Sequence, residues 1–322
     1  KLMSNFLPNY INKIIIFLVT LFIVSCSKTK DSEQNLLKIE RFEKVFYESD
    51  SISLKEVKEK YPFFFPSNFS NEVWISRLND PIQREIYNEI LYQYDDLSFL
   101  QSQITKFLEN NDKYFDSVLK PRLITINTDV DYRNRIILAD SILLIGLDNY
   151  LGEYHRFYLG IPSYIKENLN SQDIISDIVS QYAYKLIPRL DDYTFLDKII
   201  YHGKILYYKD ITLIEISDKD KIGYSEKKIN WAIENEYFVW TYFIENSILF
   251  DPDNKLNNRF INNAPFSKFY LENDKDSSEM IGKFIGWQIV KSFMKNNNIS
   301  FKEMIALKPI DIYNKSKYKP KK

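Results

Sequence analysis

The feature that most restricts the fold of this chain is its single cysteine, Cys26, which closely follows an apolar run. Residues 14–24 are apolar except for Thr20, and these eleven residues are too few to cross a bilayer core, which needs roughly 20. With one cysteine, no disulfide can form within the chain and no cluster of thiolates can hold a metal. The folded part must therefore be stabilised by its own hydrophobic core.

The residues around Cys26 resemble the lipobox of bacterial lipoproteins. Ile23 is the aliphatic residue at position −3, Ser25 is the small residue at −1, and Lys13 supplies a positive charge before the apolar run. The resemblance implies that residues 1–25 are a signal peptide and that acyl chains are attached to Cys26, which would anchor the protein stably. The alternative is an uncleaved anchor that happens to end in cysteine. Residues 26–35 are polar and predict a short tether.

Charge and composition place limits on the remaining 287 or so residues. The chain has 322 residues, 45% of them apolar, which is enough for a sizeable core. There are 43 basic and 44 acidic residues, and removing Lys1 and Lys13 with residues 1–25 leaves 41 against 44. A protein that binds nucleic acid normally shows a basic excess, so we expect no nucleic-acid partner. We predict a single globular domain over residues 36–310 and a basic, disordered tail over residues 311–322.

The apolar patterns indicate an α+β fold that is mostly helical with a small sheet. Helical spacing or helix-start signals appear at residues 54–61, from Pro81 onward, at 97–108 and after Asn170. Three runs are instead β-branched or continuously apolar and read as strands, and these are residues 122–127, 135–139 and 141–146.

The predicted helix at residues 171–187 is the most informative segment. Its apolar residues form two rows at i+4 spacing, which predicts a broad core-facing stripe. Ser180, Gln181 and Tyr184 lie on the other side, at the three positions that a His-Glu-x-x-His zinc motif would occupy. Two interpretations remain: these are solvent-facing helix residues, or they mark the lost metal site of a degenerate zincin-like scaffold. In either case we expect no metal and no cofactor.

The two histidines, His155 and His202, offer little for catalysis. His155 could form an acid–base pair with Glu153 or Asp148, or each histidine could be a partly buried structural residue among tyrosines. The sequence contains no motif for Ser-His-Asp catalysis and no glycine loop for phosphates, so we assign no catalytic residue.

Small residues one helical turn apart predict close packing of a helix. Gly282 and Gly286 have this spacing, and Lys283 and Gln288 exclude a membrane dimer face there.

Several segments together resemble the GldB family of gliding motility lipoproteins from Bacteroidetes. Beside the lipobox they are Arg41-Phe42-Glu43, Tyr61-Pro62-Phe63-Phe64, Leu147-Asp148-Asn149-Tyr150-Leu151-Gly152, Leu196-Asp197-Lys198-Ile199-Ile200-Tyr201-His202-Gly203-Lys204, Trp231-Ala232-Ile233-Glu234-Asn235-Glu236 with Trp240, Ala264-Pro265-Phe266-Ser267 and Ile285-Gly286-Trp287-Gln288-Ile289-Val290. The resemblance implies a lipid-anchored protein of the cell envelope that takes part in gliding or in type IX secretion. It implies no catalytic residue and only Cys26 as a modified site.

The expected function is therefore non-catalytic support of gliding or secretion through contacts with other machinery proteins. The tether lacks the strongly acidic run that marks surface-exported lipoproteins of this phylum, which favours an orientation facing the periplasm. We expect the anchor to lie in the outer membrane, and the inner membrane is the alternative. One alternative is an envelope hydrolase built on carboxylates such as Glu234 and Glu236. The other is a periplasmic ligand carrier, which would need a large apolar pocket.

Overall fold

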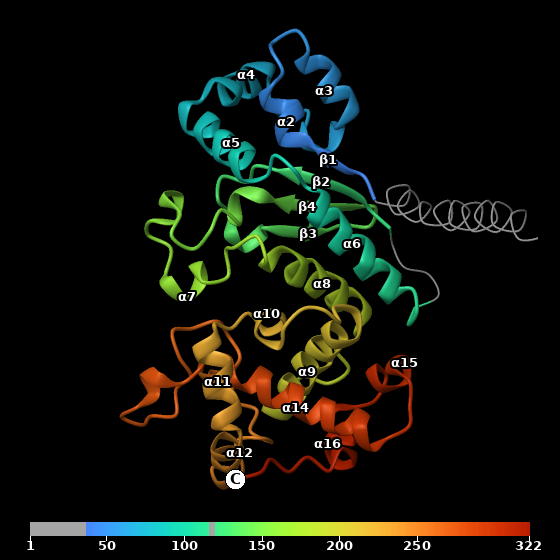
Figure 1. Ribbon diagram of the computed structural model, residues 1–322, viewed down its shortest axis with the longest axis vertical. Helices are drawn as coiled ribbons and strands as arrows, with labels where there is room; N and C mark the ends of the chain where they lie inside the picture. The colour runs from blue at the N-terminus through green and yellow to red at the C-terminus, as the bar shows by residue number, and fades with distance from the viewer. Residues whose placement is uncertain (1–36, 116–119) are drawn as a thin grey trace, which may run out of the picture. The chain divides into compact units, whose positions relative to one another are not determined.

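The computed structural model describes residues 37–115 and 120–322, and the chain divides into two units, residues 1–37 and residues 38–322 (Figure 1). The account below concerns the second unit. Cys26, the predicted signal peptide at 1–25 and the predicted tether at 26–35 lie outside the described residues. Within the second unit the prediction of a mostly helical α+β fold with a small sheet is confirmed.

A four-stranded sheet has the order β1-β2-β4-β3. Strands β1 (Ile39–Arg41), β2 (Arg122–Ile126) and β4 (Ile142–Gly146) are parallel, and β3 (Ile136–Leu138) runs antiparallel to β4. The last three are the predicted strands. Strand β1 was not predicted, because a strand of three residues that leads directly into a helix leaves no alternating pattern to detect.

Side-chain contacts hold the edge strand β1 to β2. The guanidinium group of Arg122 donates two hydrogen bonds of 2.9 Å to the carboxylate of Glu40. The buried carboxylate of Glu43 accepts a hydrogen bond of 2.7 Å from Thr125 Oγ1. The chain therefore enters the folded unit at a strand that is fixed by both backbone and side-chain bonds.

A set of short helices covers the β1 end of the sheet (Figure 1): α2 (Phe42–Tyr47), α3 (Leu54–Lys60), α4 (Asn71–Asn79) and α5 (Pro81–Gln93), with the 3-10 turn η1 (Pro62–Phe64) between α3 and α4. Helix α5 begins as predicted, because Asp80 caps it by accepting hydrogen bonds from Ile82 N and Gln83 N and Pro81 occupies its first turn. The aromatic residues around η1 pack on this group, with Phe64 4.2 Å from Phe42 between ring centroids.

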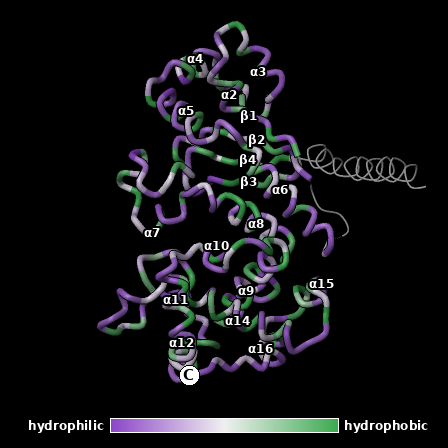
Figure 2. Tube along the Cα trace, in the orientation of Figure 1, coloured by the Kyte–Doolittle hydropathy of each residue, from purple (hydrophilic) through white to green (hydrophobic). Residues whose placement is uncertain are grey.

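Helices α6 (Ser98–Asn111) and α8 (Asp173–Leu186) follow, with the 3-10 turns η2 (Tyr132–Asn134), η3 (Leu147–Asn149) and η4 (Arg156–Tyr158) and the short helix α7 (Ser163–Lys166) between them. Helix α8 packs along β3 and against the next helix, α9. Its two predicted apolar rows are buried: Ile174, Ile178 and Tyr182 form one row, and Ile175, Val179 and Ala183 form the other. Colouring by hydropathy shows the same concentration of hydrophobic residues on the strands and α8 (Figure 2).

The C-terminal half is built on two long helices, α9 (Phe195–Thr212) and α14 (Ile281–Asn296), which pack closely. Around them lie α10 (Asp218–Ile222), α11 (Glu226–Glu234), α12 (Glu236–Glu245), α13 (Lys255–Phe260), the turn η5 (Asp274–Asp276), α15 (Phe301–Ile305) and α16 (Pro309–Ser316).

Glycine permits the close crossing of α9 and α14. A Cβ atom on Gly286 would lie 1.8 Å from the carbonyl oxygen of Ile199, and one on Gly203 would lie 2.2 Å from the carbonyl oxygen of Gly286. No side chain larger than hydrogen fits at either position. The predicted close packing at Gly282 and Gly286 is confirmed, and the structure adds Gly203 as its partner.

The prediction of a disordered tail over residues 311–322 is wrong for its first part. Helix α16 continues to Ser316, which is buried together with Ile312. Beyond the helix, the hydroxyl group of Tyr318 donates a 2.7 Å hydrogen bond to Glu236, and its ring lies 4.9 Å from Trp240. The lysine-rich composition concealed these apolar anchors.

No helix among the described residues has both the length and the apolar character needed to cross a membrane.

Candidate functional site

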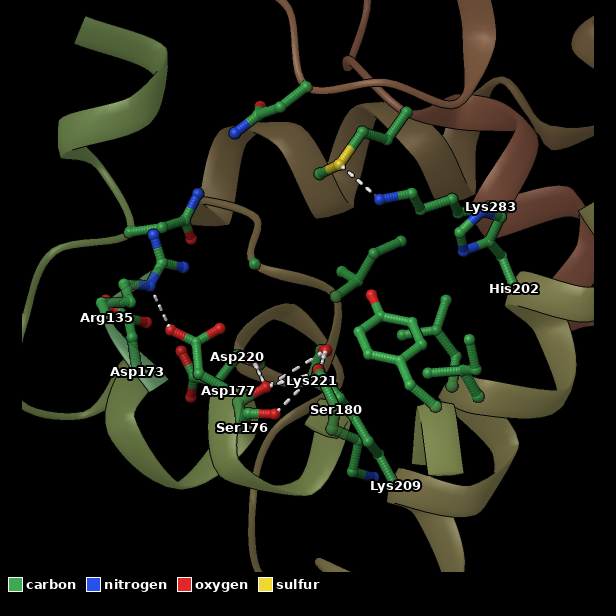
Figure 3. A pocket seen from close by; sticks show the side chains of 18 residues that line it. Arg135, Asp173, Ser176, Asp177, Ser180, His202, Lys209, Asp220, Lys221 and Lys283 are labelled. Atoms are coloured by element: carbon green, nitrogen blue, oxygen red, sulfur yellow. Dashed lines mark hydrogen bonds and ion pairs between the residues drawn. The ribbon is translucent and has the colours of Figure 1, made fainter. Parts of the chain in front are cut away.

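The strongest candidate site is a polar pocket between α8, α9, α10 and α14 (Figure 3). Its cavity volume is about 200 Å³. The side chains that line it include three cations, two carboxylates, a histidine and three hydroxyl groups: Arg135, Lys209, Lys283, Asp173, Asp177, His202, Ser176, Ser180 and Tyr184. Two further charged residues of the lining, Lys221 and Asp220, form ion pairs with Asp210 and Lys219. A pocket with several titratable groups from separate elements is a common form of binding site.

Helix α8 supplies one wall because its polar residues recur on a single side. With the apolar rows turned to the sheet and α9, Ser176, Asp177 and Ser180 face the pocket (Figure 3). Ser180 Oγ donates a 3.0 Å hydrogen bond to the carbonyl oxygen of Ser176, one turn earlier. The pattern that buries α8 thus also places its polar side at the pocket.

One end of the pocket carries an ion pair. Asp177 Oδ2 accepts hydrogen bonds from Arg135 Nε at 2.6 Å and from the hydroxyl group of Tyr150 at 2.9 Å. Next to this pair, Asp173 accepts a 3.0 Å hydrogen bond from Asn170 N. Burial raises the pKa of Asp173 to about 6, so this carboxyl group is mostly ionised at neutral pH.

Lys209 lies at the base of the pocket and contacts only neutral groups. Its Nζ donates to Ser176 Oγ at 2.8 Å and to the carbonyl oxygen of Lys221 at 2.7 Å. Burial lowers the pKa of Lys209 to about 8, because desolvation disfavours the ammonium form.

Lys283 and His202 lie together at the opposite end from Arg135 (Figure 3). The one hydrogen bond of Lys283 Nζ runs to the sulfur of Met280 at 3.2 Å, and no carboxylate of the described residues makes an ion pair with it. Burial lowers the pKa of Lys283 to about 8. Burial, helped by the charges of Lys283 and Arg189, holds the pKa of His202 well below its usual value, so this histidine is neutral at pH 7.

The three residues at the zinc-motif positions all face hollows. Ser180 and Tyr184 line the pocket itself, and Gln181 lines an adjoining hollow with Tyr132 and Arg133. Ser180 and Gln181 are half-buried and Tyr184 is 49% exposed, so both interpretations of these residues stay open. Within residues 37–115 and 120–322 no three His, Cys, Asp or Glu side chains are grouped to hold a metal ion.

The structure gives His155 a partner that was not predicted. Its Nε2 lies 3.6 Å from Glu89, and its Nδ1 accepts a 3.3 Å hydrogen bond from Phe157 N. Neither Glu153 nor Asp148 pairs with it. His155 is half-buried with the rings of Phe157 and Tyr158 beside it, at 5.0 and 5.8 Å.

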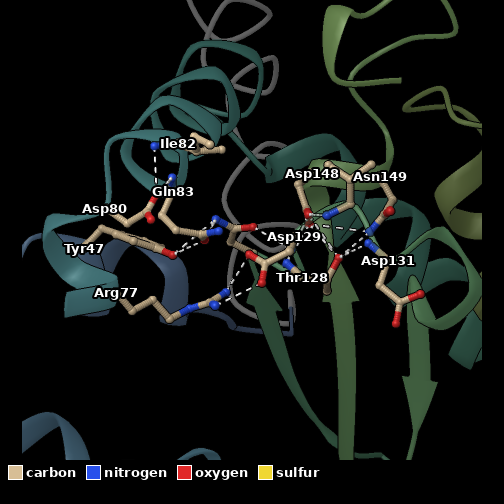
Figure 4. Close-up of polar contacts among 12 residues, drawn as sticks. Tyr47, Arg77, Asp80, Ile82, Gln83, Thr128, Asp129, Asp131, Asp148 and Asn149 are labelled. Carbon is tan, nitrogen blue, oxygen red and sulfur yellow. Dashed lines mark hydrogen bonds and ion pairs between the residues drawn. The ribbon is translucent and has the colours of Figure 1, made fainter. Parts of the chain in front are cut away.

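Asp148 has a different task, which is to hold the loop after β2 (Figure 4). Its carboxylate accepts hydrogen bonds from Thr128 N at 3.0 Å and from Val130 N at 2.6 Å. Asp129 and Val130 have φ angles of 62° and 61°, a left-handed conformation that a β-branched residue rarely adopts. The same loop is held from outside by the ion pair of Arg77 with Asp129, at 2.7 Å.

The carboxylates proposed for a hydrolase lie apart from the pocket. Glu234 is exposed near the end of α11, and Glu236 is half-buried and bonded to Tyr318. Burial raises the pKa of Glu236.

Sequence reasoning missed the three cations of the pocket. Arg135 and Lys209 gave no signal, because the pocket forms only when β3, α9 and α14 come together. The sequence does mark Lys283, because this charged residue interrupts an otherwise apolar helical segment beside Gly282 and Gly286.

The described part of the chain is thus a mostly helical α+β protein with a charged pocket. It contains no group of three possible metal ligands. The family model described as gliding motility protein GldB matches residues 25–320, and the chain belongs to this family. Its members are components of gliding motility and are not a known enzyme family. The name of the family model marks them as lipoproteins. No curated protein and no solved structure matches the chain.

Proposed function

We propose that this protein is a lipid-anchored component of the cell envelope that supports gliding, type IX secretion or both by binding other proteins of the machinery, without catalysis. The observation that carries the proposal is the extent of the family match, residues 25–320, which includes Cys26 and almost all of the folded unit. The anchor would be the acyl chains on Cys26, in the outer membrane and facing the periplasm.

The test compares two neighbouring substitutions in a strain that lacks the gene. Cys26→Ala removes the thiol that would carry the lipid, whereas Ser25→Ala keeps a small residue before the cleavage site. We expect Ser25→Ala to restore detergent-phase partitioning of the protein, single-cell gliding and secretion of type IX substrates as wild type does. Cys26→Ala should leave the protein in the aqueous phase or uncleaved and restore neither activity.

Two results would contradict the proposal. Normal gliding and secretion in the deletion strain would show that neither process needs the protein. Full rescue by Cys26→Ala would show that the function needs no lipid anchor.

The hydrolase alternative is tested in the same strain with alanine at both Glu234 and Glu236. Their side chains are not brought together in one pocket, so we expect the double variant to restore gliding and secretion fully. A loss of both activities in a variant that is stably folded would favour the hydrolase.

A further inference from the structure

The pocket between α8, α9 and α14 contains a lysine, Lys283, that makes no ion pair with a carboxylate of the described residues, although Glu279 acts on it at longer range. A lysine ammonium group has three N–H donors and usually finds oxygen acceptors when it is buried. Among the described residues, Lys283 Nζ has the thioether sulfur of Met280 as its one hydrogen-bond partner, and sulfur is a weak acceptor. At least two of its donors are therefore without a partner in this part of the chain.

Lys209 adds a second cation without a carboxylate partner. Its two hydrogen bonds, to Ser176 and to a backbone oxygen, satisfy two of three donors with neutral groups. By contrast, the charge of Arg135 is balanced by Asp177, and Lys221 is balanced outside the pocket by Asp210, at 2.9 Å. Asp177 and Asp173 act on Lys209, and Glu279 acts on Lys283, only at longer range, because no ion pair joins either lysine to a carboxylate of the described residues.

An ammonium group that is partly removed from water without an ion pair lowers the stability of the folded state. Evolution of a stable core tends to replace such a group with an apolar side chain. Methionine has nearly the same shape as lysine and would fit beside Met280. A half-buried lysine that lines a pocket fits a role in binding better than a role in packing.

We propose that this pocket binds a small oxyanion, a carboxylate or phosphate group, through the ammonium groups of Lys283 and Lys209. Charge-assisted hydrogen bonds to such a group would complete the donor sets of both lysines. His202 lies beside Lys283 as a neutral neighbour, so it adds no competing charge. The cavity volume of about 200 Å³ is large enough for such an oxyanion.

The experiment measures thermal stabilisation of the full-length protein in detergent by sodium phosphate and by sodium acetate, with sodium chloride at equal ionic strength as reference. A ligand that binds only the folded state raises the melting temperature as its concentration increases. We expect phosphate or acetate to raise the melting temperature of the wild type more than chloride does. Acetate alone would assign the site to carboxylates, and phosphate alone to phosphates.

Two lysine variants separate binding from structure. Lys283→Met should raise the melting temperature without ligand, because a half-buried charge without an ion pair is removed, and should weaken oxyanion binding roughly tenfold or more. Lys227→Met removes the same charge from the exposed side of α11 and should leave both properties as in wild type. If Lys283 serves the structure alone, the Lys283→Met variant should melt at a lower temperature than wild type and should bind the oxyanions as wild type does.

The pH dependence provides an independent check with acetate, which stays an anion throughout. Between pH 7 and 9 the titrating groups at the pocket are Lys209 and Lys283, since each has a pKa of about 8. Arg135, Asp173 and His202 do not change charge in this range, because the pKa of Arg135 is raised, that of Asp173 is about 6 and that of His202 is well below its usual value. The other charged groups around the two lysines are Asp177, Glu279, Asp220 and Lys221. Deprotonation of the lysines should therefore weaken acetate binding as the pH rises above about 8.

The proposal is overturned if neither oxyanion stabilises the wild type more than chloride does. It is equally overturned if Lys283→Met is stabilised by the oxyanions as much as wild type.

Discussion

Asp148 is the residue on which the conformation of the β2 loop depends. Its two oxygens accept hydrogen bonds from the backbone of Thr128 and Val130, and these bonds compensate for the left-handed conformation of Val130. A carboxylate suits this position because it only accepts hydrogen bonds, and every group that faces it is a donor.

Replacing Asp148 with asparagine should destabilise the protein by about 1–3 kcal/mol. The new amide has one acceptor oxygen instead of two, and its NH₂ group would face the N–H of Val130 or Thr128. We expect the melting temperature, followed by circular dichroism, to fall by about 2–4 °C per kcal/mol. Asp140→Asn, at an exposed carboxylate, serves as the control and should change nothing; equal effects in both variants would mean that the Asp148 bonds contribute no stability.

At the level of single residues, the sequence predicts burial better than it predicts contacts. The apolar rows of α8 could be read from their spacing, because helical periodicity is local. The partners of Lys283, Lys209 and Arg135 could not, because each comes from a different part of the chain. His155 shows the same limit: its partner Glu89 is 66 positions away, on α5.

The crossing of α9 and α14 determines how the C-terminal half is assembled. Both helices approach at Gly203 and Gly286, where backbone meets backbone without intervening side chains. Such an approach increases the contact area between two helices, and it leaves no space for a single added carbon atom.

Gly286→Ala should therefore be severely destabilising, by about 3 kcal/mol or more, since the methyl group would lie 1.8 Å from the carbonyl oxygen of Ile199. The helices would have to separate along their length. Gly160→Ala is the matched control: its φ of 93° strains alanine, but no atom lies within 4 Å of the added carbon. Gly160→Ala should lower the free energy of unfolding by about 1 kcal/mol. Chemical denaturation of both variants measures the two losses, and equal losses would mean that the clash at Gly286 adds nothing to the loss of glycine flexibility.

Element boundaries were predictable where a capping residue or proline marks them. Asp80 and Pro81 fixed the start of α5, and Pro62 fixed the end of α3 at Lys60. Strand β1 carried no such signal, and neither did α16, whose buried Ile312 is surrounded in sequence by lysine and other polar residues.

The whole folded unit is closed by its C-terminal segment. The hydroxyl group of Tyr318 donates a hydrogen bond to Glu236, which lies 82 residues earlier in the sequence, and its ring packs on Trp240. Both partners belong to α12, so these contacts join the C-terminal segment to the middle of the C-terminal half.

Removing residues 317–322 should lower stability by about 1–2 kcal/mol, because the partly buried ring of Tyr318 and its hydrogen bond are lost. Removing only residues 319–322 keeps both contacts and should leave the melting temperature unchanged. If the two truncations have the same effect, Tyr318 does not close the fold.

Strand β1 also has a mechanical consequence. The lipid anchor that we propose lies on the N-terminal side of Lys38, so tension between membrane and protein would enter the folded unit at β1. When the pull is directed along the strand, the hydrogen bonds to β2 and the Glu40–Arg122 ion pair bear the load simultaneously instead of breaking one after another. The three-residue edge strand would then be loaded in shear. The force needed to separate β1 from β2 would set the largest pull that the anchored protein could bear before it begins to unfold.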